Sequence, residues 1–122
     1  MNKLEYIRFL NGDIVYIHGS VRVIRSCDGY YATYYDENES LQEVNVNVIE
    51  GIPITPEILE KNGWEHKDDI YFKEYPQRKL VTYDDKVYII NESCSLFLCK
   101  VKFVHQLQNL LFGLGLNSEM DV

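Results

Sequence analysis

The chain has 122 residues, of which 46% are hydrophobic and 25% charged, a balance typical of one folded globular domain. Its formal net charge of -7 argues against direct binding of nucleic acid, which needs Lys and Arg side chains to neutralise phosphates. No apolar run approaches the roughly 18 residues of a membrane-spanning helix, and the first residues lack the pattern of a secretory signal. We therefore expect a cytoplasmic protein that contacts neither nucleic acid directly nor a membrane.

The first fifty residues predict short antiparallel strands joined by tight turns. Turn residues occur at Gly12-Asp13, at Asp28-Gly29 and over Asp36 to Ser40. This spacing favours an SH3-like barrel or a bent antiparallel sheet. The segments between the turns are rich in β-branched and aromatic residues, and they are Ile14–Ile17, Val21–Arg25, Tyr30–Tyr35 and the alternating stretch with Val44, Val46 and Val48.

A short helix is predicted over Pro56–Asn62. Thr55 is a good N-cap, Pro56 suits the first helical position, and Gly63 can adopt the left-handed conformation that ends a helix. After it come four segments with strand character, which predict an antiparallel meander. They are Ile70–Phe72, Leu80–Tyr83, Val87–Ile90 and Leu96–Cys99.

The last predicted element is an amphipathic helix that ends at Gly115. Its apolar residues fall within about 120° of a helical wheel, which suits packing on a sheet. Together the elements predict an α+β, β-rich single domain over residues 1–122, with lobes of about 1–52 and 53–122. The apolar stripe consists of Phe103, Val104, Leu107, Leu110, Leu111 and Leu114.

The opposite face of this helix carries His105, Gln108, Asn109 and Phe112. A large aromatic side chain among amides and an imidazole needs cover. That cover can come from the first lobe folding over the helix or from a partner chain, including a second copy in a homodimer. The same residues are therefore our candidate interaction surface.

The chain has ten tyrosines, and those of the segment Tyr30–Tyr35 form a second candidate surface. In a strand over Tyr30–Tyr35, side chains alternate, so Tyr31 and Tyr35 share one face and Tyr30 and Tyr34 share the other. At least one pair is expected to meet solvent or the second lobe. Tyrosine is enriched at binding surfaces, although cross-strand packing inside a small barrel is the alternative use of these side chains.

The sequence predicts no catalytic residues and no residues that bind a cofactor or a metal ion. The three histidines lack the spacing of metal ligands, and the sequence contains no Gly-rich phosphate loop. His66, Asp68 and Asp69 are expected to form a solvated turn. The three cysteines lack a cue for an activating base, and we expect them to be reduced and buried, without a disulfide between Cys94 and Cys99.

Two segments resemble a family of small uncharacterised proteins carried by phages and mobile elements of bacteroidete bacteria. Phe103–Leu114, which reads FVHQLQNLLFGL, is similar to a closing segment of the form YVHQLQNLYFAL in that family. Ile52–Trp64 is similar to the family's middle helix, which opens with IPLT and ends at Gly-Phe. Leu111 and Gly113 depart from the aromatic residue and the alanine of the family tail. The resemblance implies a phage or mobile-element accessory protein of the bacterial cytoplasm, with no assigned activity.

These observations predict a protein that is not an enzyme and works as an interaction module for a host or phage protein. Two alternatives remain open at this stage. An acidic decoy could occupy the nucleic-acid-binding site of a host protein, and its binding would then depend steeply on salt. A small enzyme is the other alternative, because a cleft is invisible in sequence.

Overall fold

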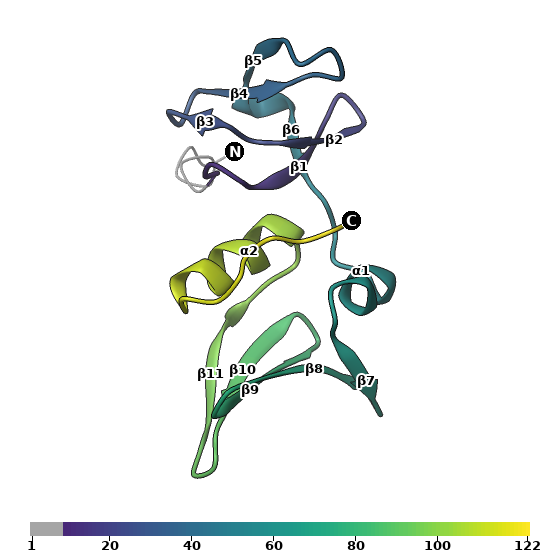
Figure 1. Ribbon diagram of the computed structural model, residues 1–122, viewed down its shortest axis with the longest axis vertical. Helices are drawn as coiled ribbons and strands as arrows, with labels where there is room; N and C mark the ends of the chain where they lie inside the picture. Colours follow the sequence, from purple (N-terminus) through teal and green to yellow (C-terminus); the bar gives the residue numbers. More distant parts are fainter. Residues whose placement is uncertain (1–8) are drawn as a thin grey trace. The chain divides into compact units, whose positions relative to one another are not determined.

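The computed structural model describes residues 9–122, which form an α+β, β-rich chain with open antiparallel sheets and a C-terminal helix (Figure 1). The chain divides into two compact units. The first contains the described residues up to Pro53 together with Phe103–Met120, and the second contains Ile54–Lys102 with Asp121–Val122. The boundary lies next to the predicted one at residue 52, but the C-terminal helix belongs to the first unit rather than to the second lobe.

The first unit contains two three-stranded antiparallel sheets, with strand orders β2-β1-β6 and β3-β4-β5. Both sheets are open, so the predicted antiparallel strands are confirmed and the SH3-like barrel is not. The expected turns after Leu10, before Tyr31 and after Tyr35 are all present. The strands are β1 (Ile14–Ile17), β2 (Ser20–Val23), β3 (Ser26–Cys27), β4 (Tyr31–Tyr35), β5 (Leu41–Asn45) and β6 (Ile49–Gly51).

The alternating valines do not form the single strand that their spacing predicts. Strand β5 ends at Asn45, and Val46–Val48 form the 3-10 helix η2. The Asn45 side chain accepts a hydrogen bond from the backbone N–H of Asn47 at 2.9 Å. This local bond caps the helical turn and competes with strand pairing, as asparagine side chains often do.

The core of the first unit lies between these strands and includes alternate residues of β1. Val15 and Ile17 are fully buried, as expected for a strand with one inward face. The helix α2 (Val104–Gly113) contacts β1 and buries Leu107 and Leu111 of the predicted apolar stripe. The buried cluster comprises Phe9, Val15, Ile17, Ile24, Ala32, Tyr34, Val46 and Ile49.

In the second unit, the predicted middle helix is confirmed as α1 (Pro56–Lys61). The Thr55 hydroxyl accepts a hydrogen bond from the N–H of Ile58 at 3.2 Å. Gly63 has a φ of 87° and ends the helix, and Trp64 is buried directly after it. The local sequence therefore determines both ends of this element.

A five-stranded antiparallel meander, in the order β11-β10-β9-β8-β7, completes the second unit. Four of its strands were predicted. The fifth, β7, was missed because its residues Glu65, His66 and Lys67 are all exposed and carry no apolar alternation. The strands are β7 (Glu65–Lys67), β8 (Ile70–Tyr75), β9 (Arg78–Tyr83), β10 (Lys86–Ile90) and β11 (Ser95–Lys100).

None of the helices in the described part of the chain is long and apolar enough to cross a membrane.

Candidate functional site

The predicted interaction face of α2 is divided between the interior and the surface of the first unit. His105 and Gln108 are buried and Asn109 is half-buried, whereas Phe112 is 72% exposed. Of the two alternatives for this face, cover from within the chain is therefore correct for His105 and Gln108, and an open partner surface is wrong for them. Phe112 alone keeps the exposure that a partner surface needs.

Gln108 joins α2 to the chain around β1. Its Oε1 atom accepts a hydrogen bond from the backbone N–H of Ile14 at 2.9 Å. Its Nε2 atom donates to the carbonyl of Gly12 at 3.0 Å and to the carbonyl of Ser118 at 3.3 Å. One side chain thus satisfies backbone groups from two distant segments, which is a structural role.

Asp13 is a buried carboxyl group in the same region. Its side chain accepts a hydrogen bond from the N–H of Leu10 at 2.8 Å and a further bond from the Asn109 side chain. Burial disfavours the charged form and raises the pKa of Asp13 to about 6, although these two bonds act in the opposite direction. The carboxyl oxygens are engaged by the fold and are not presented to a substrate.

His105 is the second buried titratable group of the first unit. Its ring lies 4.9 Å from the Phe9 ring and 5.9 Å from the Phe103 ring, measured between centroids. This burial lowers the pKa of His105 to about 4, so the imidazole is neutral at pH 7. Its Nδ1 atom has no hydrogen-bond partner among residues 9–122. The contacts with the Phe9 and Phe103 rings give this imidazole a packing role.

The second predicted surface is open to solvent. Tyr31 and Tyr35 lie on the outward side of β4 and are 48% and 49% exposed, while Tyr34 points inward and is buried. The predicted alternation is therefore confirmed from Tyr31 onwards. Tyr30 precedes the strand and is also exposed, contrary to its predicted pairing with Tyr34.

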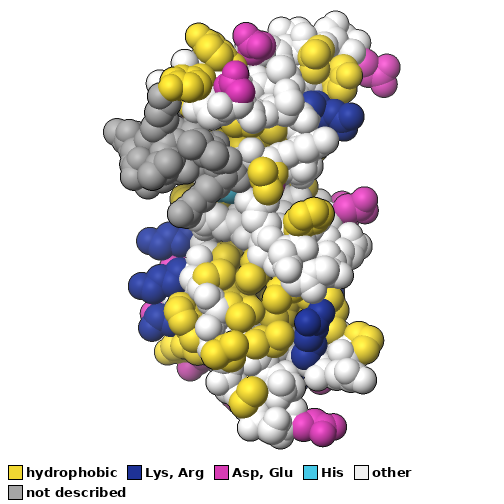
Figure 2. All heavy atoms as spheres, turned by 90° about the vertical axis from the view of Figure 1, so that its left-hand side faces the viewer, with side chains coloured by type: hydrophobic (Ala, Val, Ile, Leu, Met, Phe, Trp, Pro, Cys, Tyr) yellow, Lys and Arg dark blue, Asp and Glu magenta, His cyan; other side chains and the backbone are white. Residues whose placement is uncertain are grey.

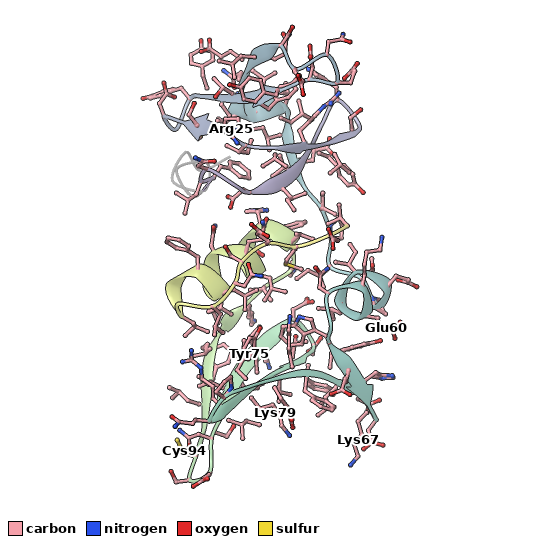
Figure 3. The ribbon with its side chains drawn as sticks, viewed as in Figure 1. Arg25, Glu60, Lys67, Tyr75, Lys79 and Cys94 are labelled. Atoms are coloured by element: carbon pink, nitrogen blue, oxygen red, sulfur yellow. The ribbon has the colours of Figure 1, made fainter. Side chains whose placement is uncertain are left out.

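Neighbouring strands extend this outward surface, which we call the tyrosine face. Directly paired residues of antiparallel strands share one side of the sheet, so Leu41 lies beside Tyr35 and Glu43 lies beside Thr33. The guanidinium of Arg25, labelled in Figure 3, lies 5.4 Å from the centre of the Tyr35 ring. The tyrosine face consists of Arg25, Ser26, Tyr31, Thr33, Tyr35, Leu41, Glu43 and Asn45.

The cysteines are free thiols, but their burial differs from the prediction. Cys94 is exposed, because it lies in the turn between β10 and β11 rather than in a strand (Figure 3). Its thiol donates to the Asn91 side chain at 3.5 Å. Cys27 and Cys99 are half-buried, and burial raises the pKa of the Cys99 thiol, which disfavours the reactive thiolate.

His66, Asp68 and Asp69 are all exposed, as predicted, but only Asp68 and Asp69 form the turn, because His66 belongs to strand β7. The His66 ring stacks on the Tyr71 ring with 4.5 Å between centroids. Across residues 9–122, no three His, Cys, Asp or Glu side chains lie close enough together to hold a metal ion.

Sequence reasoning missed the buried role of Asp13. Gly12-Asp13 was interpreted only as a turn, because carboxylates next to glycine are typical of exposed turns. The position of Asp13 directly before the apolar strand Ile14–Ile17 was the one local signal that its side chain could be covered.

Replacing Phe112 with alanine is expected to change the free energy of unfolding by no more than about 0.5 kcal/mol, because most of its ring is already in water. Urea denaturation measures this. Leu107→Ala on the buried side of the same helix is the matched control and should cost about 2–5 kcal/mol. A loss of about 2 kcal/mol or more in Phe112→Ala would contradict the exposed position of this ring.

No known family model, curated protein or solved structure matches this chain.

Proposed function

We propose that this protein is a non-enzymatic interaction module that binds a partner protein through its tyrosine face. The observation that carries the proposal is the outward side of β4, where Tyr31 and Tyr35 are each about half exposed. Leu41, which is 57% exposed, lies next to Tyr35 and enlarges the apolar part of this surface. Two aromatic side chains on one rigid strand offer a large contact area at a low cost in conformational entropy.

The chemistry around the tyrosines suits a protein partner. Arg25 stacks near Tyr35, and the Ser26 and Thr33 hydroxyls lie 2.5 Å apart on the same side of the sheet. An aromatic centre with an arginine and a polar margin is the composition typical of protein interfaces. Glu43 on the same face and the net charge of -7 disfavour a polyanionic ligand.

The partner is proposed to be a host or phage protein of the bacterial cytoplasm. This part of the proposal rests on the resemblance of Phe103–Leu114 and Ile52–Trp64 to proteins of phages and mobile elements. It extends the interaction function and does not change which residues carry it.

The test compares capture of partner proteins by the wild type and by the double variant Tyr31→Ala/Tyr35→Ala from lysate of the native host. We expect one dominant partner with the wild type and a loss of at least about tenfold in its recovery with the double variant, which corresponds to the effect of removing interface aromatics. Both side chains are half exposed, so the variant should remain folded by circular dichroism.

Tyr83→Ala is the matched control, because Tyr83 is 51% exposed and belongs to the second unit. It should retain the partner. Equal capture by the double variant and the wild type would overturn the proposal. Binding that decreases steeply with salt and persists without the tyrosines would instead favour the acidic decoy.

A further inference from the structure

The two edges of the five-stranded sheet differ in how they are protected against pairing with another strand. The edge strand β7 has three residues, two of them charged, and such short charged edges discourage pairing. The opposite edge strand, β11, has six residues, of which Ser95–Cys99 carry no charge. Among the sheet edges of the described chain, β11 is the longest, and it lacks a charged residue until Lys100.

Exposed apolar side chains lie on both sides of β11. Leu96 is 58% exposed and pairs with Ile89 on one side of the sheet, while Phe97 is 49% exposed and pairs with Tyr88 on the other. Both side chains would be covered further by a strand added at this edge.

Phe97 also ends an apolar row that crosses one side of the sheet. Phe72 pairs with Val81, Val81 with Tyr88, and Tyr88 with Phe97. The Tyr88 and Phe97 rings meet edge to face with 5.6 Å between centroids. Figure 2 shows hydrophobic side chains gathered over the part of the chain that carries β8 to β11, with Lys and Arg side chains at their margin. The row stops at β11 only because the sheet stops there.

The charges around β11 favour a second copy of this chain in antiparallel orientation. Glu92 precedes the strand and Lys100 ends it, and both are exposed. Antiparallel pairing centred on Leu96 brings the end of the strand that follows Glu92 in each copy next to the Lys100 end of the other, whereas parallel pairing brings like-charged ends together. A β-bulge shifts the register between β10 and β11 after Phe97, so Ser95–Phe97 is the regular stretch, and Leu96 is its centre.

We propose that two copies of this chain dimerise by antiparallel pairing of their β11 strands, which joins the two five-stranded sheets into one. The two-fold axis lies perpendicular to the sheet at Leu96, so the same side faces the same way in both copies. The apolar row then continues from one copy into the other through the two Phe97 side chains. This interface lies in the second unit and is separate from the tyrosine face.

The test is the dimer dissociation constant of the full chain, measured by sedimentation equilibrium across the micromolar range. We expect a reversible monomer–dimer equilibrium for the wild type. Leu96→Lys and Phe97→Lys should each raise the dissociation constant by at least about tenfold, because each places like charges next to the two-fold axis. Circular dichroism at low protein concentration checks that the variant monomers remain folded.

Two control variants separate the edge from other surfaces. Tyr83→Lys changes an exposed residue on the same side of the sheet as Phe97 but on β9, and His66→Lys changes the opposite edge. Neither should alter the dissociation constant. A wild type that stays monomeric, or a dimer that responds to these controls and not to the β11 variants, would overturn the proposal.

Hydrogen exchange provides a readout that needs no variant. The outward backbone N–H groups of Ser95–Phe97 should be protected at concentrations where the dimer forms and should exchange faster after dilution. Exchange that is independent of concentration in a dimeric sample would contradict strand pairing at this edge.

Discussion

Replacing Gln108 with leucine is expected to lower the free energy of unfolding by about 2–4 kcal/mol, because it leaves backbone groups near β1 without their partner. The N–H of Ile14 and the carbonyl of Gly12 bond to this side chain at 2.9 Å and 3.0 Å. Leucine has a similar volume, so the loss reports the missing hydrogen bonds rather than a cavity. Urea denaturation at pH 7 measures the change.

Gln42→Ala is the matched control. The Gln42 amide donates to the Asp36 carboxylate at 3.0 Å, but both side chains are exposed, so water replaces the lost bond. The expected change is within about 0.5 kcal/mol. Equal stability of Gln108→Leu and the wild type would show that Gln108 does not join α2 to β1.

The second large effect is a pair of opposing pH dependences in the first unit. The pKa of Asp13 is raised from 3.8 to about 6, so its contribution to stability is complete below pH 3.8 and is lost as pH rises through 6. The pKa of His105 is lowered from 6.5 to about 4, so its contribution is complete above pH 6.5 and is lost as pH falls through 4. Between pH 6.5 and pH 4, each group changes the free energy of unfolding by about 2–3 kcal/mol.

In the wild type the opposing contributions of Asp13 and His105 largely cancel. A variant that removes one of the two groups should therefore show the pH dependence of the other. In Asp13→Asn, which keeps an acceptor for the N–H of Leu10, the free energy of unfolding should fall by about 2–3 kcal/mol between pH 6.5 and pH 4. In His105→Gln, it should rise by a similar amount as pH falls over the same interval. The wild type should change less than either variant.

Urea denaturation across this pH interval measures the three slopes. Exposed carboxylates such as Asp36 and Glu37, whose hydrogen bonds lower their pKa values, contribute equally to all three proteins and cancel in the comparison. Parallel curves for the wild type and both variants would contradict the buried, shifted states of Asp13 and His105.

The sequence by itself determined the elements whose causes are local. Thr55, Pro56 and Gly63 define both ends of α1, because capping bonds and a left-handed glycine act within a few residues. The turn residues on both sides predicted a strand over Ile14–Ile17, and its two-residue period explains why Val15 and Ile17 share the buried side. The meander from β8 to β11 followed from tight turns, such as the Asp84-Asp85 pair, in which both residues have positive φ.

Of the two candidate surfaces, the one on β4 could be predicted from the sequence, whereas the burial of the one on α2 could not. Tyr31 and Tyr35 are outward as predicted, because strand period alone places them opposite the buried Tyr34. For Gln108 and His105 the sequence left internal cover and a partner surface as alternatives, because a helical wheel gives the angle between side chains and not the identity of what packs on each side. The structure shows that both are buried. Polar side chains on the second side of a helix are usually solvated. Gln108 is buried because backbone groups near β1 bond to its amide, whereas the His105 ring packs against the rings of Phe9 and Phe103.

Only the tertiary structure decided which unit receives α2, since an amphipathic stripe fits any apolar sheet of suitable size. It also decided that Asp13 is buried, that Val46–Val48 leave the strand, and that the charged residues of β7 pair with β8. In each case the decisive partner is a hydrogen-bonding group or an apolar surface brought in by the fold. Sequence periodicity records only the chemical character of each residue, whereas burial depends on which distant segments meet it.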